Sequence, residues 1–556
     1  MSQQSIFFTS ALCCIATAQA QTAPAPTAGE VLRELQKPAP ALPSFAPAAK
    51  SEAELDTSRV DSAKVLVKAI EIAGNQELAT ADLMAIVSSL VGTEQTIGQL
   101  SAAARRITAY YRSRGFAVAR AYLPAQDVTA GILKIAIVEG RISSSRLANT
   151  SLLSDARIGP YLEGIKTGDV VRSSQIDRGL LLLQDTPGVA GSRATLQPGA
   201  SVGTSELLVE VTPAQRLSGS VSLDNYGSRY TGESRVGLNL AIASPTGRGD
   251  QLSLSTLNTG PGLAFGRLSY QTPVGSDGLT LGVAAFGTRY KLAKEFASLD
   301  ATGKANSTSV FATYPFVRSQ TYNLRGAASV ERKNLNDTVG GTATVTDKRL
   351  MLSNLGITGS AQDAWLGGGI TSFDATLTSG QLMIDSAAAL NTDSTSAQTN
   401  GSFNKLGYGV ARLQRLSDNT FMQMSLTGQQ AGKNLDSSEK FSLGGINGVR
   451  AYPSGEASGD EGKKATLELR HNINSTWQGT FFYDYGAVKT NKFPFGTSPA
   501  ADRSLFGAGV GVNAAFENKL QIRITMAWRI NGGLPTSIPA SAAKRPTVWV
   551  AASIGF

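Results

Sequence analysis

The second half of the chain consists of short segments in which apolar and polar residues alternate. In LQIRITMAWR (520–529), the apolar residues occupy one face of an extended strand, and glutamine, threonine and two arginines occupy the other. The same two-residue period runs through RVGLNLAI (235–242), ATLELR (465–470) and PTVWVAASIGF (546–556). Successive side chains of a strand point to opposite faces, so each segment would carry one apolar and one polar face. An apolar outer face and a polar inner face are typical of a transmembrane β-barrel.

The lengths of the connections between these segments also alternate. Every second connection is short, as in SPTGRGD (244–250), LSDNT (416–420) and AFENK (515–519), whereas the others are mostly long and polar, as in KLAKEFASLDATGKANS (291–307). Outer-membrane barrels have an even number of strands, short periplasmic turns and long extracellular loops, a pattern that a soluble sandwich has no reason to follow. We therefore predict a transmembrane antiparallel β-barrel of about 16 strands over residues 214–556, with 291–307 as a surface loop.

An apolar segment near the start predicts a secretory signal peptide. IFFTSALCCIAT (6–17) is followed by AQA (18–20), so residues 1–20 would be removed. The first basic residue is Arg33, which departs from the usual signal and leaves the true start in question; a buried helix is the alternative. Cys13 and Cys14 both lie in this segment, and a mature chain without cysteine has no disulfide or thiol chemistry. Such a secreted chain fits a bacterial envelope.

Residues 21–62 combine a possible short helix with a linker. TAGE (27–30) has the spacing of a capping box ahead of three apolar residues at helical spacing. Four prolines between residues 38 and 47 make the remainder an extended linker. So short a helix is marginal in water, and from the residues alone a disordered tail is the favoured alternative.

Two soluble units precede the predicted barrel. Residues 63–140 read as strand, helix, helix, strand, strand, with Thr80 positioned to cap the first helix and Gly115 to end the second. Residues 141–213 repeat this order more loosely, with helices expected at 153–165 and 173–188. A small sheet with helices on one face leaves an edge strand to which an extended peptide can add. The alternative is that the two units are spacers.

Two further segments predict a loop folded into the barrel. The glycine-rich connection 441–462 carries Arg450 near its tip, and FFYDYGAV (481–488) sets Asp484 among aromatic residues. Alternation puts Asp484 on the face of Phe482 and Gly486, opposite two tyrosines, so lipid-facing tyrosines imply a lumenal aspartate. A guanidinium binds a carboxylate through two hydrogen bonds, which fixes orientation as well as distance. A solvated loop arginine is the alternative.

The sequence lacks the residue patterns of an enzyme. It contains one histidine, His471, no G-x-S-x-G elbow and no phosphate-binding loop. Its net charge of +9 is spread along the chain without a basic run, so no nucleic acid or nucleotide partner is expected. We expect no catalytic residues, metal or cofactor.

The motifs together resemble those of the TpsB transporters of two-partner secretion, the haemolysin secretion/activation proteins of the outer-membrane assembly superfamily. RGFAVARAYLP (114–124) and VEGRI (138–142) make the first soluble β-α-α-β-β unit similar to a POTRA (polypeptide-transport-associated) domain, and the second unit resembles one more loosely. DNYGSRYTGESR (224–235), the 441–462 segment and FFYDYG (481–486) resemble the barrel motifs. The resemblance implies POTRA 1 at 63–140 and POTRA 2 at 141–213.

The resemblance also implies site residues. Loop 441–464 would fold into the lumen and Arg450 would pair with Asp484, while the terminal Phe556 resembles a barrel signal. Ala451 stands where the family usually has glycine, and because glycine permits positive φ we expect a different turn at the loop tip. The loop motif comprises Gly444, Gly445, Val449, Arg450, Tyr452, Gly459, Asp460 and Gly462, and its wall partners are Asp484, Phe482 and Gly486.

The implied function is an outer-membrane pore of a Gram-negative bacterium that secretes one large, unfolded partner. Periplasmic POTRA domains would bind the N-terminal region of this TpsA-type exoprotein, outer-membrane lipid would surround the barrel, and the helix near residue 31 would plug the pore. Two alternatives are a barrel assembly factor, which usually has more POTRA copies, and a passive porin, which has neither POTRA domains nor the folded-in loop. The lumen would be lined by Arg235, Glu468, Arg470, Arg523 and Arg529.

Overall fold

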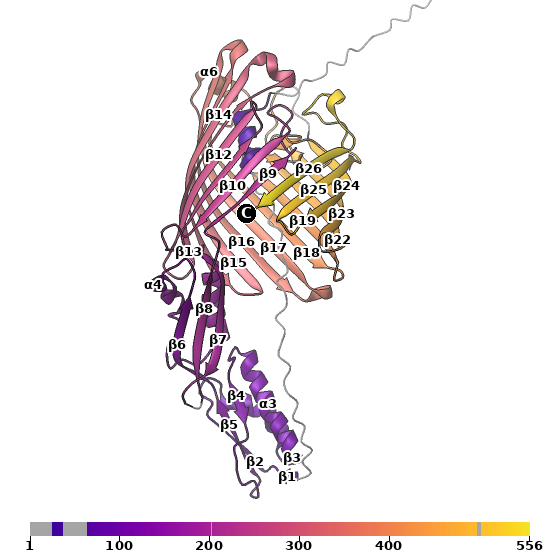
Figure 1. Cartoon of the computed structure of the whole chain (residues 1–556). Helices are drawn as coiled ribbons and strands as arrows, with labels where there is room; N and C mark the ends of the chain where they lie inside the picture. Colours follow the sequence, from indigo (N-terminus) through magenta and orange to yellow (C-terminus); the bar gives the residue numbers. More distant parts are fainter. Residues whose placement is uncertain (1–24, 37–63, 202, 497–501) are drawn as a thin grey trace, which may run out of the picture.

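The computed structural model describes residues 25–36, 64–201, 203–496 and 502–556 (Figure 1). They form a closed barrel, two small soluble units below one end of it, and a helix inside it. The predicted signal peptide (1–20) and the predicted linker lie outside the described residues. Within the described ranges, no helix is long and apolar enough to cross a membrane.

The barrel has 16 antiparallel strands, as predicted. Each pairs with its neighbour along the chain, and β26 closes the ring on β9 from Ala551↔Asp224 to Gly555↔Ser220. The strands are β9 (Leu217–Asp224), β10 (Arg235–Ala243), β11 (Gln251–Asn258), β12 (Leu263–Val274), β13 (Leu279–Lys291), β14 (Ala301–Arg318), β15 (Tyr322–Val339), β16 (Thr344–Asp363), β17 (Gly369–Ile384), β18 (Gly401–Arg415), β19 (Thr420–Ala431), β22 (Glu461–Asn472), β23 (Trp477–Lys489), β24 (Arg503–Ala515), β25 (Leu520–Arg529) and β26 (Thr547–Gly555).

The alternation of residues corresponds to the two faces of the barrel wall. On β25, Ile524, Met526 and Trp528 are exposed on the outside, whereas Thr525 and Ala527 between them are buried. Large apolar side chains on the outer face are favourable in contact with lipid, whereas the same side chains would be unfavourable in contact with water.

The prediction that residues 291–307 form a loop is wrong. β13 continues to Lys291 and β14 begins at Ala301, so only the short 3₁₀ helix η3 (Lys294–Leu299) and its neighbours connect them. Residues 301–307 contain no large apolar side chain, so the sequence of this part of β14 does not show the alternation of apolar and polar residues that predicts a strand. At this height the inner face needs only small residues such as Gly303 and Ala305, because other side chains fill the lumen.

The first soluble unit has the predicted order with two differences. Its first strand is broken into β1 and β2, and β1 pairs with an additional strand, β3. Thr80 does not cap the first helix: Ala79 is the N-cap, and the Thr80 hydroxyl instead accepts a hydrogen bond from Asn75 Nδ2 at 2.9 Å. The elements are β1 (Lys64–Leu66), β2 (Ala69–Ala73), α2 (Thr80–Val87), η1 (Ser88–Leu90), β3 (Glu94–Thr96), α3 (Ile97–Ser113), β4 (Arg120–Tyr122) and β5 (Ile132–Val138).

The second soluble unit adjoins the barrel. Its Asp185 carboxylate pairs with Arg318 at 2.7 Å, at the short turn between β14 and β15, so both units lie on the short-turn side (Figure 1). The helix expected at 153–165 is only a turn of α-helix followed by a 3₁₀ turn. The elements are β6 (Arg141–Asn149), α4 (Asp155–Ile158), η2 (Gly159–Leu162), α5 (Ser173–Gln184), β7 (Val189–Pro198) and β8 (Thr204–Pro213), with sheet order β6-β8-β7.

The short helix α1 (Ala28–Gln36) lies inside the barrel, where it is the indigo helix in Figure 1. The capping box is formed: Thr27 N donates to Glu30 Oε2 at 3.0 Å, and Glu30 N donates to Thr27 Oγ1 at 3.4 Å. Its apolar side buries Val31 and Leu32 against the barrel wall. Packing therefore provides the stability that so short a helix lacks in water.

Candidate functional site

The connection between β19 and β22 folds into the barrel. It runs from residue 432 to 460, so it begins earlier than the predicted loop 441–464, and residues 461–464, including Gly462, belong to β22. The pairing of β20 (Phe441–Ser442) with β21 (Ser458–Gly459) forms its neck. Gly444 and Gly459 have no room for a side chain, because a Cβ atom would lie 2.2 Å from Pro453 O and 2.3 Å from Lys489 O, respectively. Gly445 has φ +93°, which glycine adopts at little cost.

The guanidinium of Arg450 lies against the carboxylate of Asp484 on β23. Arg450 Nε and Nη2 donate to the two carboxylate oxygens at 2.9 and 2.8 Å, and the Arg450 backbone N donates to Oδ2 at 3.1 Å. Thr466 Oγ1 on the neighbouring strand donates to Asp484 Oδ1 at 3.0 Å. Asp484 has no exposed surface, so its charge is compensated by these donors rather than by water.

A second carboxylate extends this contact. Arg450 Nη1 lies 2.5 Å from Glu468 Oε2, and Arg470 Nε lies 2.8 Å from the other oxygen of Glu468. The ring of Phe482 lies under the guanidinium, with its centroid 3.4 Å from Arg450 Cζ, which adds a cation–π contact. Strand alternation predicts Glu468 and Arg470 on the lumenal face, but no motif in the sequence predicts the pairing of Glu468 with Arg450. The signal was available: Glu468 is the direct cross-strand neighbour of Phe482.

The loop tip packs tightly against the barrel wall. Val449, Ala451 and Tyr452 are fully buried together with Phe482. Ala451 is not among the described residues with positive φ, so the strain expected from replacing glycine does not arise. A side chain at Gly486 would lie 2.7 Å from Leu443, which explains the glycine at this wall position.

A further anchor, not foreseen from the sequence, joins the loop to residues 530–546. The carboxylate of Glu456, with no exposed surface, accepts hydrogen bonds from the backbone N atoms of Thr536 and Ser537 and pairs with Arg503 at 3.0 Å. The Tyr452 hydroxyl donates to Asn531 O at 2.8 Å. No local pattern marks Glu456, because its backbone partners, Thr536 and Ser537, lie 80 and 81 residues away in the sequence.

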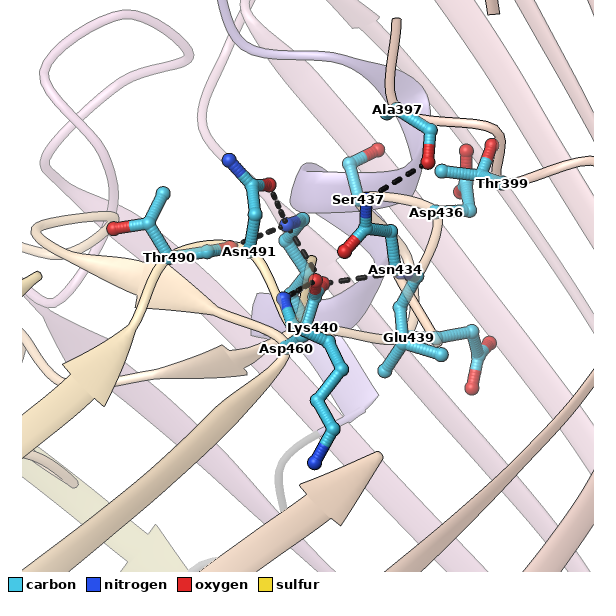
Figure 2. Close-up of polar contacts among 12 residues, drawn as sticks. Ala397, Thr399, Asn434, Asp436, Ser437, Glu439, Lys440, Asp460, Thr490 and Asn491 are labelled. Carbon is cyan, nitrogen blue, oxygen red and sulfur yellow. Dashed lines mark hydrogen bonds and ion pairs between the residues drawn. The ribbon is translucent and has the colours of Figure 1, made fainter. Parts of the chain in front are cut away.

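Residues 434–440, here called the seat segment, connect the loop to the wall through buried ion pairs. Figure 2 shows the polar contacts that Asn434, Lys440 and Asp460 make in this region. Glu439 pairs with Lys333 at 3.0 Å and with Lys405 at 2.8 Å, and Asp436 pairs with Lys348 at 2.7 Å. The predicted loop residue Asp460 has a role here: it accepts from Lys440 Nζ at 2.7 Å, Leu435 N at 3.0 Å and Lys492 N at 2.7 Å.

The helix α1 rests on the seat segment. Arg33 Nη1 donates to Ser437 O at 2.7 Å, and the hydroxyls of Thr27 and Ser437 are 2.8 Å apart. Gly29 allows the close approach, because a Cβ atom there would lie 2.7 Å from Ser437 Oγ. The helix also contacts the barrel wall, where Ala28 N donates to Asp337 Oδ1 on β15 at 2.7 Å.

Of the other predicted lumenal arginines, Arg529 lies beside the loop tip, with its Cζ atom 6.0 Å from the ring centroid of Tyr452, whereas Arg235 and Arg523 contact residues outside the loop. Arg235 pairs with Asp224 at 2.7 Å, Arg523 Nε donates to Asn513 at 3.0 Å, and Arg529 Nη1 donates to a backbone oxygen at 2.9 Å. Phe556 lies at the closing seam, where its backbone N donates to Gly219 O at 3.0 Å.

Comparisons with known proteins agree with this architecture. A sequence model of the family described as haemolysin secretion/activation protein ShlB/FhaC/HecB matches residues 203–514, and one described as POTRA domain, ShlB-type, matches residues 65–140. The heme/hemopexin transporter protein HuxB of Haemophilus influenzae strain 86-028NP is 29% identical over 80% of this chain and 79% of its own length. The outer membrane transporter CdiB of Dickeya dadantii strain 3937 is 26% identical over 82% of this chain and 81% of its own.

A solved structure shares the fold. CdiB from Escherichia coli aligns with a TM-score of 0.71 at 18% identity and covers 95% of both chains. The family match extends over more than half of the chain and includes most of the barrel together with the folded-in loop. It decides among the three functions considered from the sequence in favour of secretion. The chain therefore belongs to the haemolysin secretion/activation protein family ShlB/FhaC/HecB, the outer-membrane transporters of two-partner secretion.

Proposed function

We propose that this protein secretes one dedicated exoprotein, in an unfolded state, through a pore that α1 closes at rest. The observation that carries this proposal is the position of α1 within the lumen, fixed to the seat segment and to β15 by hydrogen bonds. An extended chain and this helix cannot occupy the same space. Transport therefore requires α1 to leave, and its few polar contacts are of a kind that water can replace.

The proposed binding site for the partner is the free edge of the second soluble unit. β7 is one of the two edge strands of the sheet β6-β8-β7 and has ten residues, whereas the edge strands β2 and β4 of the three-stranded sheet in the first unit have five and three. An extended peptide can add to such an edge through backbone hydrogen bonds, with little demand on its sequence. Hydrogen exchange of the full chain with and without the N-terminal region of the partner tests this. We expect slower exchange in residues 189–198; protection confined to the first unit would exclude this edge.

The clamp between Arg450 and Asp484 has a positioning role in the proposal. It holds the folded-in loop, and with it the seat segment, against one side of the lumen, which leaves the space occupied by α1 as the route. A buried charge left without its partner is strongly unfavourable, so the loop position depends on both residues.

The test of the proposed function is a survey of secreted and outer-membrane proteins after deletion of the gene. We expect one large exoprotein to disappear from the medium and to return on complementation. A broad loss of other barrels would instead indicate an assembly factor, and no change in either set would indicate a passive pore. Complementation with the Asp484→Asn variant is the matched control, because it preserves shape and removes the charge.

A further inference from the structure

The outer wall of β11–β16 carries two adjoining hollows of different character. One, of about 490 Å³, is lined mainly by apolar side chains, among them Leu268, Val283, Val310, Val330 and Met351. The other, of about 500 Å³, lies nearer the long loops and is lined by polar and basic side chains, among them Arg289, Lys291, Lys304 and Asn336. Between them Gly266 pairs with Gly287, and a Cβ atom on either glycine would meet open space.

The floor of the apolar hollow is made of small residues. Strand register places Leu268, Ala285, Thr308, Arg332 and Met351 in one row across five strands. Ala285 and Thr308 are the small members of this row, and larger side chains stand on both sides of them. The result is an apolar depression in the outer wall that leads towards the glycine pair and the basic hollow.

Three cations at this position, Arg289, Lys304 and Arg332, have no partner among the described residues. Arg289 and Lys304 are direct cross-strand neighbours on the outer face, an arrangement of like charges that destabilises a sheet. Neither they nor Arg332 form an ion pair or hydrogen bond with any residue that the structure describes. The nearby acids are already engaged, Asp300 with Lys291 at 2.8 Å and Asp347 with Asn336 at 2.6 Å.

The three cations lie at the upper border of the apolar band. On the outer face of β15, Tyr322, Leu324, Ala328 and Val330 precede Arg332. Tyr322 follows the turn beside the Arg318–Asp185 ion pair, on the side of the soluble units, so Arg332 lies towards the outer leaflet. There the wall meets lipid that carries phosphate groups directly above its acyl chains.

We propose that these two hollows form a binding site for lipid A, the phosphorylated, multiply acylated glycolipid of the outer leaflet. An acyl chain lies on Ala285 and Thr308, and a phosphate lies between Arg289 and Lys304 with Arg332 beside it. The phosphate relieves the repulsion of the cross-strand cations, and the apolar hollow excludes water from the chain. This site lies outside the barrel and is independent of the route that the partner takes.

Native mass spectrometry of the full chain in detergent, titrated with bis-phosphorylated hexa-acylated lipid A, tests this proposal. We expect the combined variant Arg289→Gln, Lys304→Gln and Arg332→Gln to weaken binding about tenfold or more. Lys463→Gln is the matched control, because Lys463 is also an exposed cation on the outer face, on β22, and we expect it to bind like the parent protein. Ala285→Phe, which fills the floor and leaves the charges intact, should also weaken binding.

Two further measurements test whether a loss of binding reflects the phosphate site rather than general damage to the barrel. Dephosphorylated lipid A should bind the parent protein as weakly as lipid A binds the triple variant. Each variant must keep the electrophoretic shift between heated and unheated samples that indicates a folded barrel. Unchanged binding by the folded triple variant, an equal loss with Lys463→Gln, or equal binding of phosphatidylglycerol would overturn the proposal.

Discussion

Ala451, at the tip of the folded-in loop, lies directly against Gly507 of β24. A Cβ atom on Gly507 would be 2.7 Å from the Cβ atom of Ala451, which is closer than two carbon atoms that are not bonded to each other can approach. The alanine in the loop and the glycine in the wall are therefore a complementary pair. This contact explains how an alanine fits at position 451, which the sequence alone does not explain.

The small and the smaller side chain of this pair can be exchanged between positions 451 and 507. Gly507→Ala should push the tip away from the wall and destabilise the folded-in loop by roughly 1–3 kcal/mol, the usual cost of overpacking. Adding Ala451→Gly removes the clash and should restore most of the loss. The measurement is the temperature at which the purified barrel loses its electrophoretic shift. Equal melting of the single and double variants would show that the two residues do not share a contact.

A test of the charge clamp by exchanging its two charges must include Glu468 as well as Arg450 and Asp484. Arg450→Asp with Asp484→Arg places the new carboxylate beside Glu468, so this double variant should recover secretion only in part. Adding Glu468→Gln removes that repulsion and should improve recovery. Each single substitution at the clamp should cost about 3–5 kcal/mol, because it leaves a buried charge unpaired. Quantification of the exoprotein in the medium is the readout. If the triple variant is no better than Arg450→Asp alone, the pairing does not matter for secretion.

The seat of α1 predicts a way to open the pore. A side chain at Gly29 would collide with Ser437 and with the backbone of Ser438, so Gly29→Val should displace the helix. We expect a higher open fraction of single channels in planar bilayers. Gly164→Val, in the second soluble unit, makes the same substitution where a Cβ atom would meet open space, and it serves as the control. If the closed fraction of the Gly29→Val channel is unchanged, the position of α1 does not control channel opening.

The buried acid of the seat segment predicts a pH response. Burial alone would raise the pKa of Glu439, but the ammonium groups of Lys333 and Lys405 outweigh it and lower the pKa from 4.5 to about 2. The stabilisation that Glu439 provides is therefore complete above pH 4.5 and is lost as the pH falls towards 2. The parent channel should behave alike at pH 7 and pH 5.

Lys333→Met removes one of the two cations and leaves the burial of Glu439. The pKa of Glu439 should then rise, and channel opening should increase between pH 7 and pH 5 in this variant only. Planar bilayer recordings at both values provide the comparison. An acid response in the parent protein, or its absence in the variant, would contradict this account of the seat.

The barrel could be predicted from the sequence because lipid imposes alternation on the wall residues. The prediction failed at residues 301–307, where the strand rises beyond the apolar band and its outer face needs no apolar side chains. The pairing of Arg450 with Asp484 could be proposed from a motif together with strand alternation. The seat ion pair of Lys333 and Glu439 could not, because it joins residues 106 positions apart without a local pattern.

The central claim is that the partner crosses the lumen of this barrel as an extended chain. Both cysteines lie within the predicted signal peptide, so a single cysteine can be introduced and cross-linked selectively. Arg523→Cys places it on the lumenal face of β25, and Ile524→Cys places it on the lipid face one residue away. With a stalled partner, a cross-linked adduct from Arg523→Cys and none from Ile524→Cys is the predicted result. Adducts from both positions, or from neither while secretion proceeds, would contradict passage through the lumen.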